Sequence, residues 1–123
     1  MTPRIFLSAV LLVALATPAL ADDPCGPLPA APAVPDGKTA SKDQILAART
    51  DVTAFLKTSD QYQGCLKTYL DQKTQEAAKD KNSVDPSVKA GVLAKADSNQ
   101  RDKVRVGNDF NKAVTAFNAA HPN

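Results

Sequence analysis

Between residues 41 and 80 the apolar positions of the chain recur at steps of three and four. The stripe contains one serine among apolar and aromatic residues: Ile45, Ala48, Val52, Phe55, Ser59, Tyr62, Leu66 and Tyr69, with Leu56 and Leu70 beside them. Steps of this size bring side chains to one face of an α-helix. Ser41 is a favourable N-cap, and Asp43 complements the helix dipole in the first turn. We therefore predict a long amphipathic helix over 41–80.

A second stripe with the same steps follows a polar connector at 80–85. Its members are Val88, Val92, Ala96, Val106, Phe110, Ala113, Phe117 and Ala120. A polar stretch at 99–103 interrupts it, which we interpret as a solvent-facing turn or as a place where another chain or ligand inserts. Asp85 is a suitable N-cap and Pro86 a favourable first helical residue. The pattern predicts a helix over 86–120, and no segment shows the alternation typical of strands.

A short connector makes the two helices antiparallel neighbours. The predicted fold class is therefore all-α, a long antiparallel two-helix hairpin. Folding about position 83 would set Phe55 near Phe110 and Val52 near Val114. Ordering a chain costs about 1–2 kcal/mol per residue, so two stripes alone give a marginal core. A second copy that completes a four-helix bundle would enlarge this core, and so would the segment that precedes the first helix.

That preceding segment, which we call the strap, covers residues 22–40 and is rich in proline. The prolines are Pro24, Pro27, Pro29, Pro32 and Pro35, with small residues between them. Such spacing prevents a helix and favours the extended polyproline II conformation. The triplet at 35–37, Pro-Asp-Gly, is typical of a turn. The strap is thus predicted to be extended and to reverse direction before the first helix.

The first 21 residues have the features of a Sec-type signal peptide. Arg4 supplies the positive start, residues 5–20 are mostly apolar, and Ala-Leu-Ala at 19–21 predicts cleavage after Ala21. The apolar core is too short for a membrane span, which argues against an uncleaved anchor. Cys25 lies too far from the cleavage site for a lipoprotein. We predict a periplasmic or secreted product that is not inserted in the membrane, with a signal peptide at 1–21 and a hairpin domain at 41–123.

Cys25 and Cys65 are the two cysteines of the chain. In an oxidising compartment, such a pair in a small exported domain predicts a disulfide. The strap can span about 50 Å, more than the roughly 36 Å of helix between positions 41 and 65, so it can double back and reach Cys65. Gly64 would then allow a close approach of the two backbones. The alternative, a redox or metal-binding pair, usually takes the form Cys-x-x-Cys at a helix start.

Three short segments give the chain a resemblance to a group of small exported proteobacterial helical-hairpin proteins. The segments are Pro-Asp-Gly-Lys-Thr-Ala-Ser at 35–41, Tyr-Gln-Gly-Cys-Leu at 62–66 and Phe-Asn at 117–118. Gly64 departs from the pattern of that group, in which a helix-favouring residue precedes the cysteine. The resemblance implies export, a helical hairpin and a disulfide, and it implies no activity.

Charge and residue inventory exclude several functional classes. The net charge of +2 includes Arg4, so the mature chain carries about one positive charge, too little for nucleic-acid binding. His121, the only histidine, lies near the C-terminus, and Glu76 is the only glutamate. We therefore expect no Ser-His-Asp arrangement, no zinc, iron–sulfur or haem site, and no cofactor. The chain also lacks a glycine-rich phosphate loop. We predict that the protein is not an enzyme.

Tyr62 and Tyr69 are seven residues apart and share a face of the first predicted helix. They could form a stacking platform for a ligand or an aromatic anchor for a partner, or they could simply pack in the apolar stripe. The leading hypothesis is a non-catalytic periplasmic structural or protein-interaction module that binds itself as a homodimer or binds an envelope protein. The alternative is a small-ligand carrier or chaperone-like binder that uses the groove near Tyr62 and Tyr69.

Overall fold

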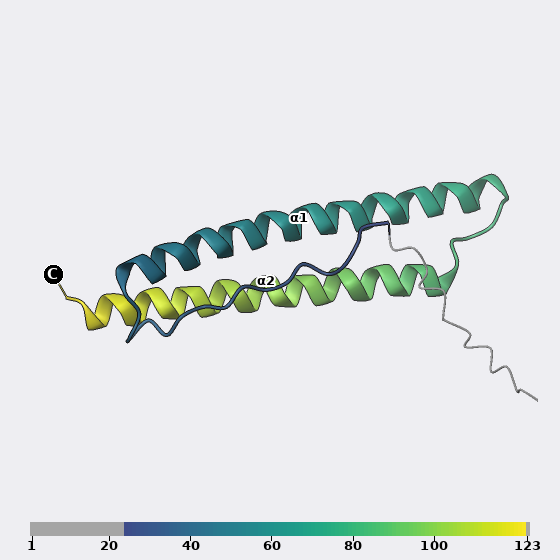
Figure 1. The fold of residues 1–123 in the computed structure, drawn as a ribbon. Helices are drawn as coiled ribbons and strands as arrows, with labels where there is room; N and C mark the ends of the chain where they lie inside the picture. Colours follow the sequence, from purple (N-terminus) through teal and green to yellow (C-terminus); the bar gives the residue numbers. More distant parts are fainter. Residues whose placement is uncertain (1–23, 123) are drawn as a thin grey trace, which may run out of the picture.

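The computed structural model describes residues 24–122, which form two long antiparallel α-helices (Figure 1). Helix α1 spans Lys42–Lys79 and helix α2 spans Pro86–Ala120. The structure confirms the all-α hairpin, and the described residues contain no strand. The signal peptide predicted at 1–21 lies outside the described residues.

Local sequence signals start both helices. At α1 the backbone N–H of Gln44 donates to the Ser41 hydroxyl at 3.2 Å, and the Ser41 N–H donates to the Gln44 side chain at 2.8 Å. This reciprocal pair is a capping box, which satisfies two otherwise unpaired donors. At α2 the Asp85 carboxylate accepts from the Ser87 N–H at 2.7 Å, one residue after Pro86. Because these caps need only neighbouring residues, the sequence predicts each helix start to within one residue.

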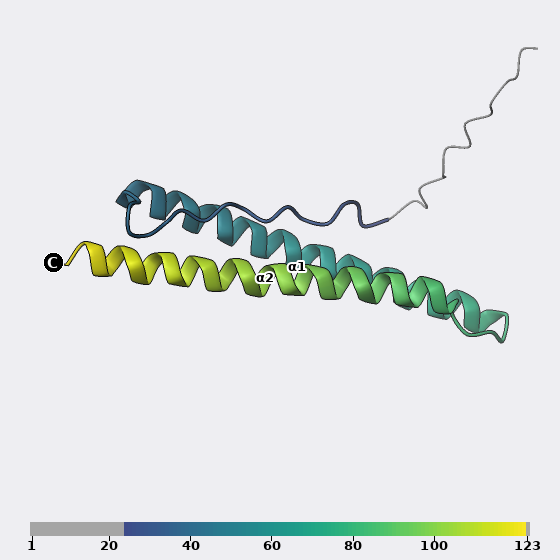
Figure 2. The same cartoon turned by 90° about the horizontal axis from the view of Figure 1, so that it is seen from below.

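The strap lies lengthwise beside the helix pair as an extended chain (Figures 1 and 2). It reverses at a turn in which the Asp36 carbonyl accepts from the N–H groups of Thr39 and Ala40, at 3.2 and 2.9 Å. The Asp36 side chain accepts from the Lys38 N–H at 2.9 Å. The extended strap and the turn agree with the sequence prediction. The strap packs on residues of both helices and occupies the groove between them, whereas the sequence placed it along the first helix alone.

The core consists of three apolar clusters, and each contains residues of α1, α2 and the strap. The strap contributes Val34 and the buried Ala40 to the first, Ala31 and Val34 to the second, and Cys25 to the third. The buried members from the helices are Ile45 and Ala113 in the first cluster, Val52, Phe55 and Val106 in the second, and Tyr62, Leu66 and Val92 in the third. The strap is therefore the third element of the core.

The register of the two helices differs from the prediction by about one helical turn. Phe55 and Phe110 share a cluster, as predicted. Val52, however, packs in the cluster of Val106, while Val114 belongs to the neighbouring cluster. The helices are therefore not paired symmetrically about position 83. Contacts in the middle of the hairpin, such as that of Ser59 with Asn99, fix the register instead. Within residues 24–122, no helix has a stretch apolar and long enough to cross a membrane.

Candidate functional site

The strap is anchored to α2 at Gly37. This residue is buried, and a Cβ added to it would stand 1.9 Å from the carbonyl oxygen of Ala113. Only glycine allows two backbones to approach so closely. The sequence placed the close approach at Gly64, and this expectation is wrong: Gly64 is exposed, and a Cβ there would meet no heavy atom within 4 Å.

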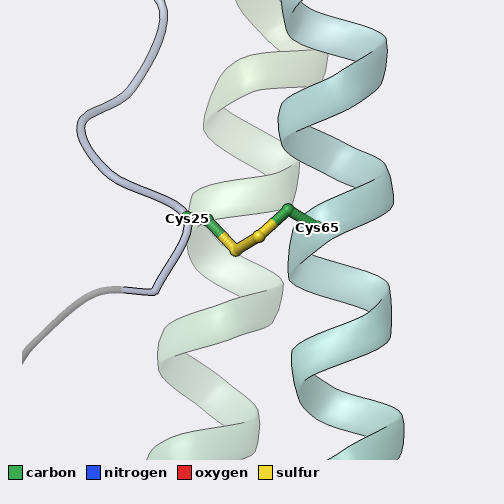
Figure 3. The surroundings of a disulfide bond; sticks show 2 residues. All are labelled: Cys25 and Cys65. Atoms are coloured by element: carbon green, nitrogen blue, oxygen red, sulfur yellow. A yellow bond between two sulfur atoms is a disulfide. The ribbon is translucent and has the colours of Figure 1, made fainter.

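The other end of the strap is bonded to α1 by a disulfide between Cys25 and Cys65 (Figure 3). The two Cα atoms are 5.7 Å apart, and both residues are half-buried. No cysteine within residues 24–122 is free. The pairing is the one that the sequence predicts. The strap is thus held at one end by a covalent bond to α1 and at the other by a close backbone contact with α2.

The two candidate tyrosines have different surroundings. Tyr62 is 6 % exposed and packs with Leu66 and Cys25 in the third cluster. Tyr69 is half-buried against the same cluster, and the ammonium group of Lys73 lies 5.8 Å from the centre of its ring. Such a distance permits a weak cation–π attraction. Both tyrosines therefore contribute to the core, as the packing alternative expects.

A surface cavity of about 610 Å³ lies between the strap and α1. Leu28 and Pro27 line it on the strap side, while Tyr62 and Cys65 line it on the helix side. Tyr69 is not part of its wall. The groove that the sequence placed near both tyrosines thus reaches only Tyr62.

A buried polar layer crosses the middle of the hairpin. Ser59 and Asn99 are both fully buried, and the Asn99 side-chain amide donates to the Ser59 hydroxyl at 3.1 Å. The Gln63 amide donates to the Asn99 side-chain oxygen at 3.0 Å and to the Gln100 side-chain oxygen at 3.2 Å. A buried polar group costs little only while it has such partners. The layer therefore favours the register in which Ser59 faces Asn99.

The interpretation of 99–103 as a solvent-facing turn is wrong at Asn99. A signal for its burial was present, because Asn99 continues the seven-residue spacing of Val92, Val106 and Ala113, the other buried residues of α2. A single asparagine at such a position is a known device for fixing register between helices. Asn99 lies within the polar stretch 99–103, which hides this spacing in the sequence.

The two edges of the hairpin differ in what covers them. We assign heptad positions with Ile45 of α1 at position a and Val92 of α2 at position d, so that the core residues occupy a and d. Positions c and g of both helices then flank the core on one side of the hairpin, and positions b and e flank it on the other side. Cavities between the strap and the helices are lined at c and g positions, by Asp51 and Thr58 of α1 and by Asp109 of α2. We call this side the strap edge, and the opposite side, which no described residue outside the helices covers, the open edge.

Large aliphatic side chains gather on the open edge. Leu46 is 48 % exposed, Leu93 52 % and Val104 53 %, and all three occupy b or e positions. Leu56 and Val114 are half-buried at e positions. At the c and g positions of residues 44–65 and 95–119, by contrast, the residues are small, polar or charged, with Cys65 the least polar. The open edge is therefore the more apolar of the two, although it faces solvent.

Charged side chains near the open edge pair within the chain. Lys103, whose side chain is 18 % exposed, bonds to Asp60 of the other helix. Lys67 pairs with Asp71 at 2.7 Å. Asp97 pairs with Arg101 one turn further along its own helix. Exposed pairs of this kind contribute less than about 1 kcal/mol each, so their main effect is to leave the open edge nearly neutral.

The described residues offer few groups for metal binding or acid–base chemistry. Within 24–122 no three His, Cys, Asp or Glu side chains lie close enough to hold a metal ion. The His121 ring stacks on Phe117 with ring centres 4.3 Å apart, and its Nδ1 lies 3.0 Å from the Phe117 carbonyl oxygen. Comparisons of the chain with protein-family models, with curated proteins and with solved structures found no match.

Proposed function

We propose that the protein is a non-catalytic structural or protein-interaction module of the periplasm, with the open edge as its contact surface. The observation that supports this most directly is the contrast between the two edges. The strap edge is polar or small and already covered, while the open edge exposes Leu46, Leu93 and Val104 to solvent. Exposed aliphatic side chains that line up along one face are typical of a protein-binding surface.

The way the strap is held also supports a role in binding. A partner that docks on a preformed surface loses less entropy than one that must order it. Cys25–Cys65 and the contact of Gly37 with α2 hold the strap over one side of the hairpin, and this keeps the two helices together. The open edge is thereby presented on a fixed pair of helices.

Two further features support the proposed compartment. The signal peptide predicted at 1–21 would export the chain, and disulfides persist in oxidising compartments such as the periplasm. The bonded pair Cys25–Cys65 is consistent with such a location. We therefore place the module in the periplasm or outside the cell.

Site-specific photo-crosslinking in the exporting cell tests this function. A photoreactive residue would replace Leu46 or Val104 on the open edge, and in matched controls Thr50 or Asn108, which are exposed at outward-facing f positions. We expect protein adducts from the open-edge positions and few from the controls. Equal yields at all four positions, or no adduct at any, would contradict the proposal.

The cavity of about 610 Å³ beside Tyr62 favours one second candidate, a small-ligand carrier. Its strap wall includes Leu28, which is 38 % exposed and could cover an apolar ligand. Native mass spectrometry of protein extracted from its own cells without reductant tests this. A carrier would show an adduct of defined mass that is lost in Leu28→Ser, whereas a bare protein would count against a carrier.

A further inference from the structure

We propose that the occupant of the open edge is a second copy of this chain, and that the two hairpins form a four-helix bundle around a twofold axis parallel to their length. The proposal rests on the proposed function, because it names the partner of the same surface. In this arrangement α1 of one copy lies against α2 of the other, antiparallel to it. The two straps lie on the outer sides of the bundle, over the strap edges.

The first argument is that the apolar residues of the open edge come in pairs at the same height along the hairpin. The heights are fixed by contacts between the helices, among them Asp60 with Lys103 and Gln63 with Asn99. Counting along each helix from these contacts places the open-edge residues of α1 and α2 within one helical turn of each other. The resulting pairs are Leu46 with Val114, Leu56 with Val104, and Leu70 with Leu93.

A twofold axis along the hairpin leaves every height unchanged, so each apolar pair meets the same pair of the second copy. Leu56 then contacts the second copy's Val104, and Val104 its Leu56. A twofold axis across the helices would reverse the heights and set α1 of one copy against α1 of the other. With Leu46 at the height of the second copy's Leu70, Arg49 then meets the second copy's Lys67, which carries the same charge. Because an isologous interface must be complementary to itself, these like charges favour the axis along the hairpin.

The second argument is charge complementarity. With heights unchanged, Lys67 of one copy lies at the height of the second copy's Asp97, and both are at b positions of the open edge. Asp60 keeps its partner Lys103 within its own hairpin. Opposite charges thus face each other at Lys67 and Asp97, which favours this pairing over one that sets like charges together. Arg49 is the other charged residue at a b or e position of α1 before Asp60. It lies near the height of the second copy's Asn111, which is uncharged, so no like charges meet there.

The third argument is length. The aliphatic residues of the open edge extend from Leu46 to Leu70, which is about 36 Å of helix. An occupant that covers them needs an apolar helical surface of similar length. The chain has such a surface in its own open edge, carried by helices of 38 and 35 residues. Two hairpins of this length can pack against each other as a four-helix bundle.

Sedimentation equilibrium of the oxidised chain after signal cleavage tests the dimer. We expect twice the chain mass for the native sequence. Leu46→Lys with Val104→Lys should lose the dimer, while Thr50→Lys with Asn108→Lys, which adds the same charges at outward-facing positions, should keep it. Circular dichroism shows whether both variants retain the helices. A dimer that survives Leu46→Lys with Val104→Lys would overturn the proposal.

Cysteine crosslinking tests the axis. The chains with Leu56→Cys and with Val104→Cys are made separately, with the native disulfide intact, and are then mixed under mild oxidation. An axis along the hairpin predicts covalent dimers in the mixture and none from either variant alone. Covalent dimers from Val104→Cys alone would show an axis across the helices and overturn the arrangement.

The two proposals fail differently. A chain that stays monomeric at all concentrations, while photo-crosslinks from Leu46 and Val104 in cells join it to another protein, would overturn the dimer and leave the interaction module in place. A monomer without adducts from the open edge would overturn both.

Discussion

The strapped half of the hairpin and the end that carries the loop are built from the same two helices, yet only one of them has a closed core. The strap begins beside Cys65 and runs away from the loop, so that of the residues the structure describes, only those of the two helices and their loop form the loop end, residues 67–91 (Figures 1 and 2). Among the described residues, α1 has no buried residue after Leu66 and α2 none before Val92. The third element, rather than helix length, therefore closes this core.

The loop end is held by local interactions instead. The Asn82 N–H donates to the Ala77 carbonyl at 2.9 Å, and Lys81 takes the left-handed conformation with φ of 56°. This arrangement is typical of a helix C-terminus. Lys73 bonds to Glu76 at 2.8 Å and lowers the pKa of that carboxyl. Since such contacts involve near neighbours, the loop end should open independently of the strapped half.

The largest expected effect comes from removing the disulfide. Replacing Cys25 and Cys65 by serine frees a segment that closes a loop of 40 residues, and the chain-entropy account predicts a loss of about 4 kcal/mol. Urea denaturation measures the loss. Limited proteolysis should find new cleavage in the strap, while amide exchange in residues 67–91 stays as in the native chain. An unchanged midpoint would mean that the strap adds no stability.

A smaller loss is expected at the other anchor of the strap. Gly37→Ala forces a methyl group against the Ala113 carbonyl, so the turn must move, at a cost of about 2–3 kcal/mol. Gly64→Ala is the matched control. Its methyl group meets no atom within 4 Å, and it should stabilise the helix by about 1 kcal/mol. Equal melting temperatures for the two variants would contradict the role of Gly37.

Disrupting the buried polar layer should lower the free energy of unfolding by about 2 kcal/mol. Asn99→Ala leaves the buried Ser59 hydroxyl without its partner, and the cost is that of an unpaired polar group. Ser59→Ala combined with Asn99→Leu removes both polar groups and should recover most of the stability. A double variant that is less stable than Asn99→Ala, measured by urea denaturation, would show that the layer contributes more than paired hydrogen bonds.

The smallest effect is a pH dependence at the loop end. The hydroxyl and the N–H of Ser87 donate to the Asp85 carboxylate and hold its pKa below the ordinary value. The cap is therefore fully formed above the unfolded pKa of about 4 and weakens as the pH falls through the lower folded value. The protection factors of the amides in the first turn of α2, which are corrected for the intrinsic pH dependence of exchange, should fall on acidification. In Asp85→Asn, whose side chain does not titrate, this acid-dependent change should be absent.

The sequence predicts best those features that depend on neighbouring residues. Ser41 and Asp85 locate the helix starts. The presence of two cysteines predicts the disulfide, and the length of the strap allows Cys25 to reach Cys65. Gly37 could not be singled out, because its role depends on a backbone 76 positions away in the chain, at Ala113.

The apolar stripes in the sequence also do not predict the open edge. Which side of the hairpin the strap covers depends on where its turn meets α2, and only then can one edge be distinguished from the other. Leu46, Leu93 and Val104 look like scattered surface residues along the chain. For Asn99 the seven-residue spacing is a signal in the sequence, but its partners Ser59 and Gln63 on the other helix are fixed only by the register.

The buried layer around Asn99 has a practical consequence for protein engineering. Ser59 and Asn99 fix the register of the two helices, so the register does not depend on the loop at 80–85. This loop can therefore accept an inserted sequence. A peptide or small domain inserted after Asn82 would be displayed at the end of a rod about 55 Å long. In a bundle with its twofold axis along the hairpin, the two inserted domains would lie side by side at the same end. The bundle would then serve as a bivalent display scaffold.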